Sequence, residues 1–472
     1  MAGLRRRDVL AGAVALAGAA TIGLNPPAAA AANRQRPGTP YAPSLDFGDY
    51  PVVARVRARR ALEHLRVLSD HIGTRVAGTE GELRAKDYLA RVLRELHYQV
   101  TVQPFPIADK FLGSLRVGRD TWQTGSSPQA QQDVTREAAV IDVGAGDTLP
   151  ADLTGKIVLI AAVQNNAEAY RLAAERGAVA VLLGRIGADP ARKLSAFSPT
   201  LTAPVAVPVL GLAQVQVERL RKRLAEGPLR VSASAVHHKN LTSHNVIAER
   251  PATFPGRDDG VVMVSAHYDS VPGSPGANDD GSGTVLCLEL ARVLRHLPTT
   301  RAVRFALWGA EEYGLIGSKH YVGQLSDVDA RRIRGCFQND MVATSYDPAT
   351  VYWLLSVDGA DNATTQAVGS AAKRLGYDPR VRGPVARGSS DHVPFFERGI
   401  AAANFSWRGE SGPAVLEPTY HTPEDTIADN VSLERLQVSL ELIGAAAYNQ
   451  SLIKQRRCRR PSNCISRWSP FH

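Results

Sequence analysis

The sequence predicts an α/β fold in which a mixed central sheet has helices on both faces and carries a smaller inserted α/β module. The first observation is an alternation of apolar runs of strand length with helical patterns, which is typical of a largely parallel or mixed sheet. The strand-like runs cover residues 98–105, 245–249, 261–266, 303–308, 335–339, 352–356 and 401–405. The helical patterns cover residues 52–68, 80–96, 283–297, 314–322, 361–375 and 431–448.

The second observation is a change of character between residues 113 and 236. Strand-like runs alternate there with one helix, and no cluster of His, Asp or Glu is present. The runs cover 138–143, 156–162, 178–183 and 206–212, and the helix covers 167–176. A nucleotide-binding fold is the alternative for this stretch, but no Gly-x-Gly-x-x-Gly opens a helix in it. We therefore expect an inserted module that covers the site or positions the substrate.

The third observation is the length of 472 residues, which is too great for one simple core and favours two domains plus extensions. We expect a catalytic domain in two parts, at 51–112 and 241–450, with the inserted domain at 113–240. A targeting segment at 1–32 and an extended Pro- and Gly-rich lead-in at 33–50 precede it, and a basic tail at 451–472 follows.

Residues 1–32 have the pattern of an export signal. Three arginines at 5–7 precede a weakly apolar stretch that ends near Leu24, and an alanine run follows with cleavage points near Ala30 or Ala32. Adjacent arginines before such a stretch resemble a twin-arginine signal, with an ordinary Sec signal as the alternative. By either route we expect a bacterial protein that is secreted.

The net charge of +9 lies largely at the two ends of the chain, in residues 5–7 and in four arginines between 456 and 460. Because no nucleic-acid motif with interleaved aromatic residues is present, the charge describes solvated tails, and no nucleic-acid partner is expected. After the signal no run is long and apolar enough to span a bilayer, so we expect no stable membrane insertion. We also expect a monomer.

Four cysteines are too few for a disulfide scaffold. Cys458 and Cys464 lie close together in the polar tail and could close a small loop in an exported protein. Cys287 and Cys336 fall in apolar segments, where an inert core position is the expected role.

Polar side chains follow the strand predicted at 261–266. His267 ends this strand, at the carboxyl edge where open α/β sheets place their chemistry. Asp269 points to the same side if the extended backbone continues, and its carboxylate can then accept the second N–H of the histidine. Asp279 follows in a Gly/Asn/Asp loop before a helix. A carboxylate held in such a turn can bridge two cations.

Two further strands end in carboxylates, and a histidine follows later. Glu311 and Glu312 come after the strand at 303–308, and Asp340 comes after the strand at 335–339. Neighbouring carboxylates point in different directions, so one can hold a metal while the other faces a bound water as general base. His421 lies in a polar loop before the last helix. Each group alone is more typical of a solvated or structural position, but together they form a set.

The complete set is mostly nitrogen and carboxylate oxygen and contains no thiolate. Its members are His267, Asp279, Glu312, Asp340 and His421. This mixture suits two zinc ions that share a bridging carboxylate, whereas calcium would require more oxygens and no imidazole. A water shared by two such ions loses its proton near neutral pH and becomes a hydroxide nucleophile.

Several motifs resemble the secreted co-catalytic di-zinc aminopeptidases, in the form that carries an inserted protease-associated domain. The motifs are His-Tyr-Asp, Asn-Asp-Asp-Gly-Ser-Gly, Trp-Gly-Ala-Glu-Glu-Tyr-Gly-Leu-Ile-Gly-Ser, Asn-Asp-Met and Tyr-His-Thr-Pro-Glu-Asp-Thr. The match extends over nearly the whole mature chain, including residues 73–78 and 243–246. The family is that of the bacterial leucyl aminopeptidases and the transferrin-receptor-like metallopeptidases, and it implies a zinc-peptidase fold of the phosphorylase/hydrolase-like type.

The resemblance also implies a role for each residue of the set. His267 and Asp340 would hold one zinc ion, Glu312 and His421 the other, and Asp279 would bridge them. The other implied roles are Glu311 as the general base, Asp269 as the group that orients His267, and Tyr420 as a donor to the tetrahedral oxyanion. A cis peptide bond between Asp279 and Asp280 is implied as well. Arg387 lies in a loop similar to the family's substrate-pocket segment and is expected to contact the substrate.

The expected activity is hydrolysis of the N-terminal peptide bond of peptides with a free N-terminus, with a preference for large apolar residues that rests on the resemblance alone. Four alternatives remain open. A dipeptidase or a carboxypeptidase has the same fold, and Arg387 or Arg408 could hold a terminal carboxylate in the latter. A glutaminyl cyclase would usually work with one zinc ion. A non-catalytic receptor ectodomain would bind none.

Overall fold

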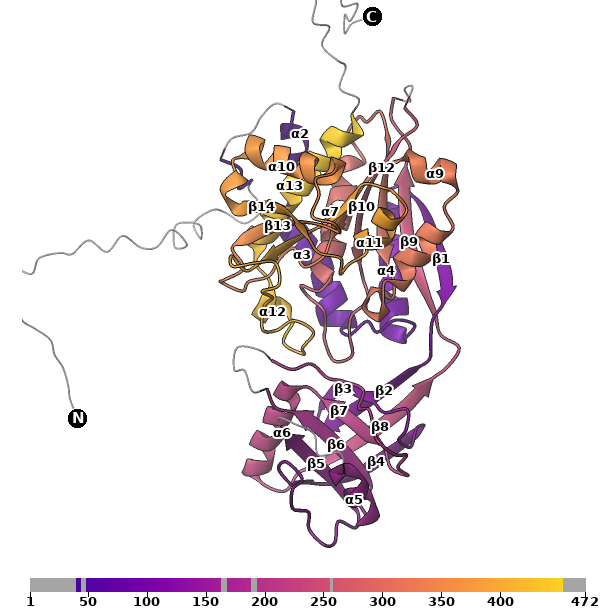
Figure 1. The fold of residues 1–472 in the computed structure, drawn as a ribbon, viewed down its shortest axis with the longest axis vertical. Helices are drawn as coiled ribbons and strands as arrows, with labels where there is room; N and C mark the ends of the chain where they lie inside the picture. The colour runs from indigo at the N-terminus through magenta and orange to yellow at the C-terminus, as the bar shows by residue number, and fades with distance from the viewer. Residues whose placement is uncertain (1–39, 44–47, 163–167, 188–192, 255–257, 453–472) are drawn as a thin grey trace, which may run out of the picture. The chain divides into compact units, whose positions relative to one another are not determined.

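The computed structural model describes residues 40–43, 48–162, 168–187, 193–254 and 258–452 (Figure 1). The predicted export signal, Cys458, Cys464 and the tail from residue 453 lie outside the described residues. Within the described ranges, no helix is both long enough and apolar enough to cross a membrane.

An eight-stranded mixed sheet forms the larger part of the fold, in the order β1-β9-β11-β10-β12-β15-β13-β14. Its central strands β11, β10, β12 and β15 are parallel, whereas β1, β9 and β13 pair antiparallel to their inner neighbours. The strands are β1 (Gln99–Pro106), β9 (Thr242–Arg250), β10 (Val261–His267), β11 (Ala302–Trp308), β12 (Ile333–Asn339), β13 (Val351–Ser356), β14 (Val381–Ala386) and β15 (Ala402–Arg408). The predicted fold class is therefore confirmed.

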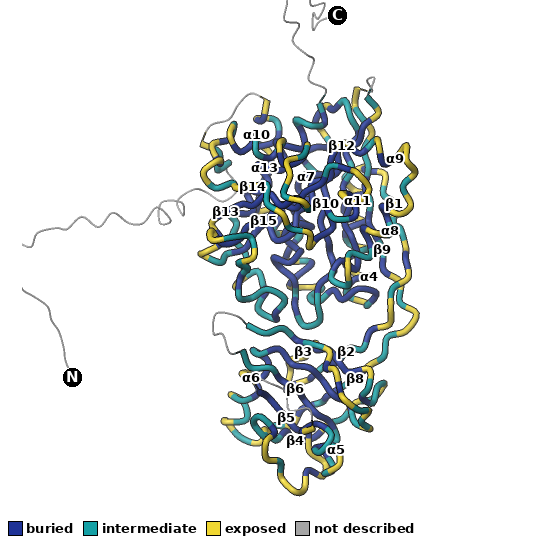
Figure 2. Tube along the Cα trace, viewed as in Figure 1, coloured by how far each residue is buried: buried dark blue, intermediate teal, exposed yellow. Residues whose placement is uncertain are grey.

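Helices cover both faces of this sheet because its strands are apolar on both sides. In β10, Val262 and Val264 pack into one core cluster and Met263 packs into another on the opposite face. Figure 2 shows β10, β12 and β15 running through the buried interior. The first face carries α2 (Tyr50–Val53), α3 (Ala58–Arg66), α4 (Glu80–Glu95), α7 (Gly281–Leu294), α10 (Ala363–Leu375) and α13 (Leu433–Ser451). The second carries α8 (Ile316–Gly323), α9 (Asp327–Arg332) and α11 (His392–Glu397).

The inserted stretch folds as a closed barrel in the order β2-β3-β7-β6-β5-β4-β8. Its strands are β2 (Lys110–Val117), β3 (Asp120–Ser126), β4 (Val134–Asp142), β5 (Lys156–Ala162), β6 (Ala180–Arg185), β7 (Val209–Leu212) and β8 (Arg230–His238). Two helices accompany them, α5 (Ala169–Glu175) and α6 (Gln214–Glu226). The four predicted strands and the predicted helix are all present. The assignment of this barrel as a protease-associated domain stays a prediction.

The prediction of one continuous helix at 52–68 was wrong. The chain forms α2 and α3 with Arg57 extended between them, followed by the π-helical turn η1 (Val67–Ile72). At the break, the N–H groups of Arg57 and Ala58 donate to the side chains of Glu289 on α7 and Gln437 on α13, at 2.7 and 2.8 Å. Because buried side chains replace the helical carbonyl acceptors, the apolar spacing alone did not reveal the interruption.

The helix predicted at 314–322 begins later than expected. A 3₁₀ turn, η2 (Glu311–Tyr313), comes first, and Gly314 and Leu315 have positive φ angles before α8 begins. The edge strand β14, which follows the short 3₁₀ turn η3 (Asp378–Arg380), was not predicted. It contains Pro384 and is largely exposed, so it lacks the apolar pattern of a buried strand. The short helix α12 (Ile427–Asn430) precedes α13.

Candidate metal centre

The predicted site residues meet at the carboxyl edge of the central strands. β10 lies between β11 and β12 and runs parallel to both. His267 is the last residue of β10, Asp340 directly follows β12, and the turn η2 after β11 carries Glu311 and Glu312. Since parallel strands end at the same edge, their terminal side chains are brought together. Asp279, just before α7, and His421, in the loop between β15 and α12, complete the set.

The five predicted ligands form two overlapping groups that share Asp279. One group is His267, Asp279 and Asp340, and the other is Asp279, Glu312 and His421; within each group the ligand atoms lie within 4.8 Å of one another. Asp279 extends one carboxylate oxygen to each histidine, with Oδ1 at 3.2 Å from His267 Nε2 and Oδ2 at 2.9 Å from His421 Nε2. His421 Nε2 is also 3.1 Å from a Glu312 carboxylate oxygen.

The donor set fits a pair of cations. Asp279 and Asp340 are only 5% and 6% exposed, and so many buried carboxylates cost free energy unless positive charge compensates them. Within the part of the chain that the structure describes, His421 Nε2 makes no hydrogen bond of normal geometry despite these carboxylate neighbours, and Glu312 Oε1 has no hydrogen-bond partner. Two imidazoles with carboxylate oxygens and no thiolate are ligands that suit zinc.

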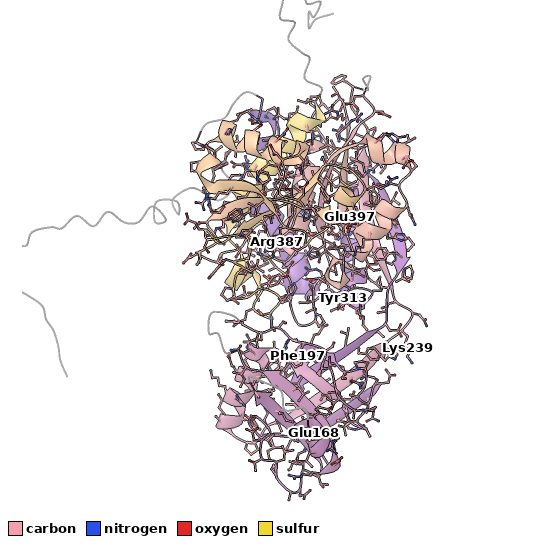
Figure 3. All side chains as sticks on the ribbon, in the orientation of Figure 1. Glu168, Phe197, Lys239, Tyr313, Arg387 and Glu397 are labelled. Atoms are coloured by element: carbon pink, nitrogen blue, oxygen red, sulfur yellow. The ribbon has the colours of Figure 1, made fainter. Side chains whose placement is uncertain are left out.

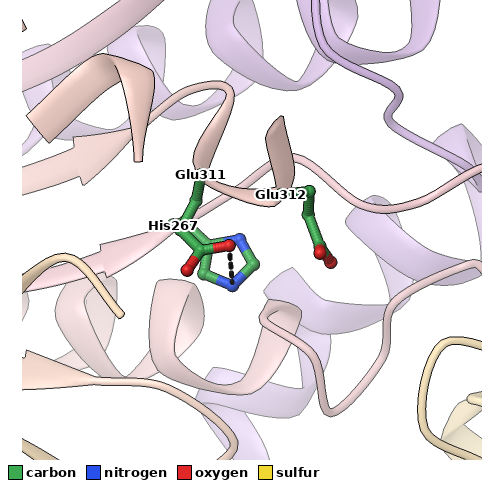
Figure 4. Close-up of side chains that lie close together, drawn as sticks. All are labelled: His267, Glu311 and Glu312. Atoms are coloured by element: carbon green, nitrogen blue, oxygen red, sulfur yellow. Dashed lines mark ion pairs between the residues drawn. The ribbon is translucent and has the colours of Figure 1, made fainter. Parts of the chain in front are cut away.

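Glu311 lies beside this cluster, facing the same imidazole nitrogen of His267, Nε2, that faces Asp279 and Asp340. Figure 4 shows its carboxylate against the imidazole, 3.9 Å from Nε2, while Glu312 leaves the turn at a separate point. Burial raises the pKa of Glu311 well above its usual value, although the charge of His267 opposes the shift. The adjacent glutamates therefore have different surroundings, as their predicted roles require.

Asp269 supports two parts of the site at once. Its carboxylate lies 3.5 Å from His267 Nδ1, a longer separation than a normal hydrogen bond. It also accepts hydrogen bonds from the backbone N–H groups of Glu311 and Glu312, at 3.0 and 3.3 Å. Asp269 is fully buried, so it holds the turn η2 in place as well as facing the histidine.

Asp280 has a structural function that the sequence did not reveal. Its carboxylate caps α7 by accepting from Gly283 N at 2.8 Å, and it also accepts from the backbone N–H groups of His267 and Met341. It thereby ties the end of β10 to the segment after β12. The peptide bond between Asp279 and Asp280 is cis, which confirms the expectation from the resemblance.

Tyr420 and His421 form a stacked pair with ring centroids 3.7 Å apart. Burial alone would lower the pKa of His421, but the carboxylates of Glu312 and Asp279 outweigh it and raise that pKa to about 11. Burial raises the pKa of Tyr420, and the nearby carboxylates, Asp279 first, add to the shift. Tyr420 is therefore a neutral O–H donor at the edge of the cluster.

Arg387, which is labelled in Figure 3, follows β14 in the chain and is half-buried. No ion pair joins it to any of the five predicted ligands within the described residues, and its Nε makes no hydrogen bond. Burial and the neighbouring Arg408 lower its pKa, while Asp340 opposes the shift. Arg387 thus lies close enough to the cluster for the charge of Asp340 to affect its pKa, but it makes no ion pair with the predicted ligands among the described residues.

Two buried charged residues near the site were missed by the sequence reading. Arg75 is fully buried and donates to the backbone carbonyls of Tyr268, Pro275 and Gly276 at 2.6, 2.6 and 2.9 Å, so it organises the loop between His267 and Asp279. Glu82 accepts from Gly78 N at 2.6 Å, and burial together with the charge of Asp269 raises its pKa to about 8.

Sequence patterns indicate the roles of Arg75 and Glu82 only weakly. They lie in or beside the Gly-rich turn at residues 73–78, whose motif carried the resemblance without an assigned role. The partners of Arg75 are backbone carbonyls of a distant loop, and sequence patterns do not identify such partners.

Comparisons with known proteins agree with this arrangement. Residues 245–447 match the model of Peptidase family M28. The chain is 37% identical over 417 residues to aminopeptidase YwaD of Bacillus subtilis (strain 168), covering 87% of this chain and 88% of that protein. It is 30% identical over 434 residues to an aminopeptidase of Pseudomonas aeruginosa (strain UCBPP-PA14), covering 81% and 78%.

Solved structures give the same result. BSAP, a zinc aminopeptidase from Bacillus subtilis, superposes with a TM-score of 0.61 at 35% identity, covering 85% of this chain and 96% of that chain. An aminopeptidase from Aneurinibacillus sp. strain AM-1 superposes with a TM-score of 0.54 at 30% identity, covering 86% and 97%. The expected family is confirmed by these matches together with the fold and the clustered residues: the chain belongs to Peptidase family M28.

Proposed function

We propose that this chain is an aminopeptidase that binds two zinc ions and hydrolyses the N-terminal peptide bond of peptides. The observation that carries the proposal is the convergence of five side chains in two groups that share Asp279. The similarity to a zinc aminopeptidase over most of both chains supports it.

In this proposal His267 and Asp340 hold one zinc ion, Glu312 and His421 hold the other, and Asp279 bridges them. The opposed placement of the two Asp279 oxygens, one toward each histidine, supports the bridging role. Zinc ions in these positions supply Lewis acidity, which polarises the substrate carbonyl and lowers the pKa of a water. Asp269 faces His267 Nδ1 and keeps Nε2 directed at the cluster.

Glu311 is the general base and acid. Its carboxylate accepts a proton from the attacking water and returns it to the amine that leaves, so no net proton is consumed. The Glu311 carboxylate is buried beside the cluster, 3.9 Å from His267 Nε2, a position that supports this role. Tyr420 donates its O–H to the oxyanion that develops on the carbonyl oxygen.

The substrate is a peptide with a free N-terminal ammonium group. The similarity over most of both chains to proteins named aminopeptidases supports this substrate class. A preference for large apolar N-terminal residues rests on the family resemblance, and a contact of Arg387 with the substrate is part of the same proposal.

The setting of the enzyme is proposed from the sequence. Residues 1–32 direct export by the twin-arginine route in a bacterium, the mature protein is secreted as a monomer, and the barrel is a protease-associated domain.

The test is hydrolysis of a panel of aminoacyl-p-nitroanilides by the mature protein, before and after treatment with a chelator. We expect activity that is highest for large apolar residues such as leucine, is lost on metal removal and returns with added zinc. Activity that survives complete removal of metal would overturn the proposal.

A pair of blocked peptides separates the aminopeptidase from a carboxypeptidase on the same fold. We expect the peptide with an amidated C-terminus to be cleaved and the peptide with an acetylated N-terminus to resist. The reverse result would assign Arg387 or Arg408 to a terminal carboxylate. Conversion of an N-terminal glutamine peptide to its pyroglutamyl form, with loss of ammonia and no cleavage of the peptide bond, would instead indicate a cyclase.

A further inference from the structure

Asp425 links the two loops that supply Asp279 and His421. Its carboxylate is fully buried and uses both oxygens: Oδ1 accepts from Asn278 N at 2.9 Å, and Oδ2 accepts from Asp279 N at 3.0 Å. Its backbone carbonyl accepts from Ala277 N at 3.0 Å. Three consecutive N–H groups, at residues 277–279, therefore donate to this one residue.

Asp425 is also fixed to the turn that carries His421. Its own N–H donates to the carbonyl of Thr422 at 3.1 Å, and Thr422 N donates in turn to the carbonyl of Thr419 at 3.0 Å. Asn430 at the end of α12 donates to Asp425 Oδ1 at 2.8 Å. Asp425 is thus fixed by hydrogen bonds within the segment that carries His421, and its carboxylate accepts the N–H groups of the segment that carries Asp279.

The consequence concerns the geometry between Asp279 and His421. Their side chains are 2.9 Å apart, yet the residues are far apart in the chain, and among the described residues no strand pairing joins the loops on which they lie. A side chain that accepts both backbone N–H groups of Asn278 and Asp279 fixes the position from which the Asp279 carboxylate extends. Groups of this kind set the orientation of metal ligands without touching the metal.

We propose that Asp425 is the positioning residue that places the bridging carboxylate of Asp279 against His421, and so sets the affinity of the site for its second zinc ion. This inference rests on the proposed function. It predicts that loss of the Asp425 bond to Asp279 weakens zinc binding while the fold persists.

Glu417 provides a matched control in the same loop. Its carboxylate is 3% exposed and accepts from Asn278 Nδ2 at 2.8 Å and from Asn430 Nδ2 at 3.1 Å. Among the residues that the structure describes, Glu417 makes no hydrogen bond to the backbone of Asp279, and it is not among the proposed ligands. If Asp425 had only a structural role, replacing Asp425 or Glu417 should change the zinc affinity to the same extent.

The experiment compares zinc binding to the metal-free full-length mature protein and its D425N and E417Q variants by isothermal titration calorimetry, with a competing chelator. Asparagine keeps one acceptor oxygen but directs an N–H₂ group at the N–H of Asp279, so only that bond is lost. We expect two zinc ions on the wild type and an affinity for the weaker one that falls about 10- to 100-fold in D425N. In E417Q we expect the zinc affinity to stay within about threefold of the wild type, in line with the scatter of such measurements.

A second readout separates positioning from catalysis. Saturating zinc should restore kcat of D425N to within about threefold of the wild type with KM unchanged, because the reacting groups are intact. Equal zinc affinity in D425N and the wild type, or an equal loss in D425N and E417Q, would overturn the inference. Should D425N fail to fold, D425E, which displaces both oxygens by one methylene, carries the same comparison. A wild type that binds no zinc would instead refute the proposed function.

Discussion

Glu311 and Glu312 are neighbours in the chain, but their side chains have different surroundings. Glu312 lies beside His421 and Asp279, whereas Glu311 lies against His267. Asp269 accepts hydrogen bonds from the backbone N–H groups of both residues, and these bonds hold the turn η2 in place. A single substitution can therefore affect one role and leave the other intact.

Replacing Glu311 with glutamine should leave zinc binding intact and lower kcat by about 10²- to 10⁴-fold, because the proton acceptor is lost and the shape is kept. The measurement is kcat on leucyl-p-nitroanilide beside the zinc content by mass spectrometry. Glu397 is exposed on α11, and Glu397→Gln serves as the control with unchanged kinetics. Substantial residual activity in Glu311→Gln with two zinc ions bound would remove Glu311 from the mechanism.

Glu82 should make stability depend on pH. Its pKa is raised from 4.5 to about 8 in the folded chain, so the folded state binds a proton that the unfolded state releases. Its contribution to stability is complete below pH 4.5 and is lost as pH rises through 8, by about 1.4 kcal/mol per pH unit at most. Glu82→Gln should therefore lose less stability than the wild type between pH 5 and pH 8 in urea unfolding. Parallel pH profiles for the two proteins would contradict this assignment.

At the residue scale, the sequence predicted the convergence of the five proposed ligands better than the groups around them. His267, Glu312 and Asp340 were predictable because each lies at or just after the end of an apolar strand, and parallel strands end at one edge. Arg75, Asp280 and Asp425 were not, because they act on backbone groups of loops distant in the chain. A hydrogen bond to a distant backbone group leaves no periodic pattern.

At the scale of elements, the position of α7 depends on how closely its first turn approaches β12. A methyl group on Gly283 would lie 1.9 Å from the carbonyl oxygen of Asn339 and 2.6 Å from both carboxylate oxygens of Asp280. The helix that follows Asp279 can therefore pack here only with glycine at its third position.

Gly283→Ala should force α7 away from β12 and lower the free energy of unfolding by about 1–3 kcal/mol or more. The same change at Gly323, the last residue of α8, meets no atom within 4 Å. Gly323→Ala should thus leave stability unchanged or raise it by up to about 1 kcal/mol. Equal unfolding midpoints for the two variants in guanidinium chloride would show that the close approach is unimportant.

The elements themselves were predictable where the apolar pattern is strong and both faces are buried. β5 was predicted at residues 156–162, and the structure has it at Lys156–Ala162. The pattern failed for β14, which is an exposed edge, and at the break between α2 and α3, where Glu289 and Gln437 provide acceptors from other helices. Local periodicity contains no information about such distant acceptors.

At the scale of the whole molecule, zinc should contribute to stability as well as to chemistry. Several carboxylates are buried together at the junction of β10, β11 and β12, and cations offset their repulsion. Zinc at about 100 times the dissociation constant of each site should raise the free energy of unfolding over the chelated protein by about 2.7 kcal/mol per ion, or about 5.4 kcal/mol for two. Thermal unfolding with and without chelator measures this difference, and coincident transitions would indicate that the cluster does not bind zinc.

The central claim is that five side chains from separate parts of one chain hold two zinc ions around Asp279. The most direct measurement is anomalous diffraction at the zinc absorption edge from crystals of the zinc-loaded protein. The account predicts two peaks that share Asp279, one beside His267 and Asp340 and the other beside Glu312 and His421. A single peak, or peaks remote from Asp279, would contradict it.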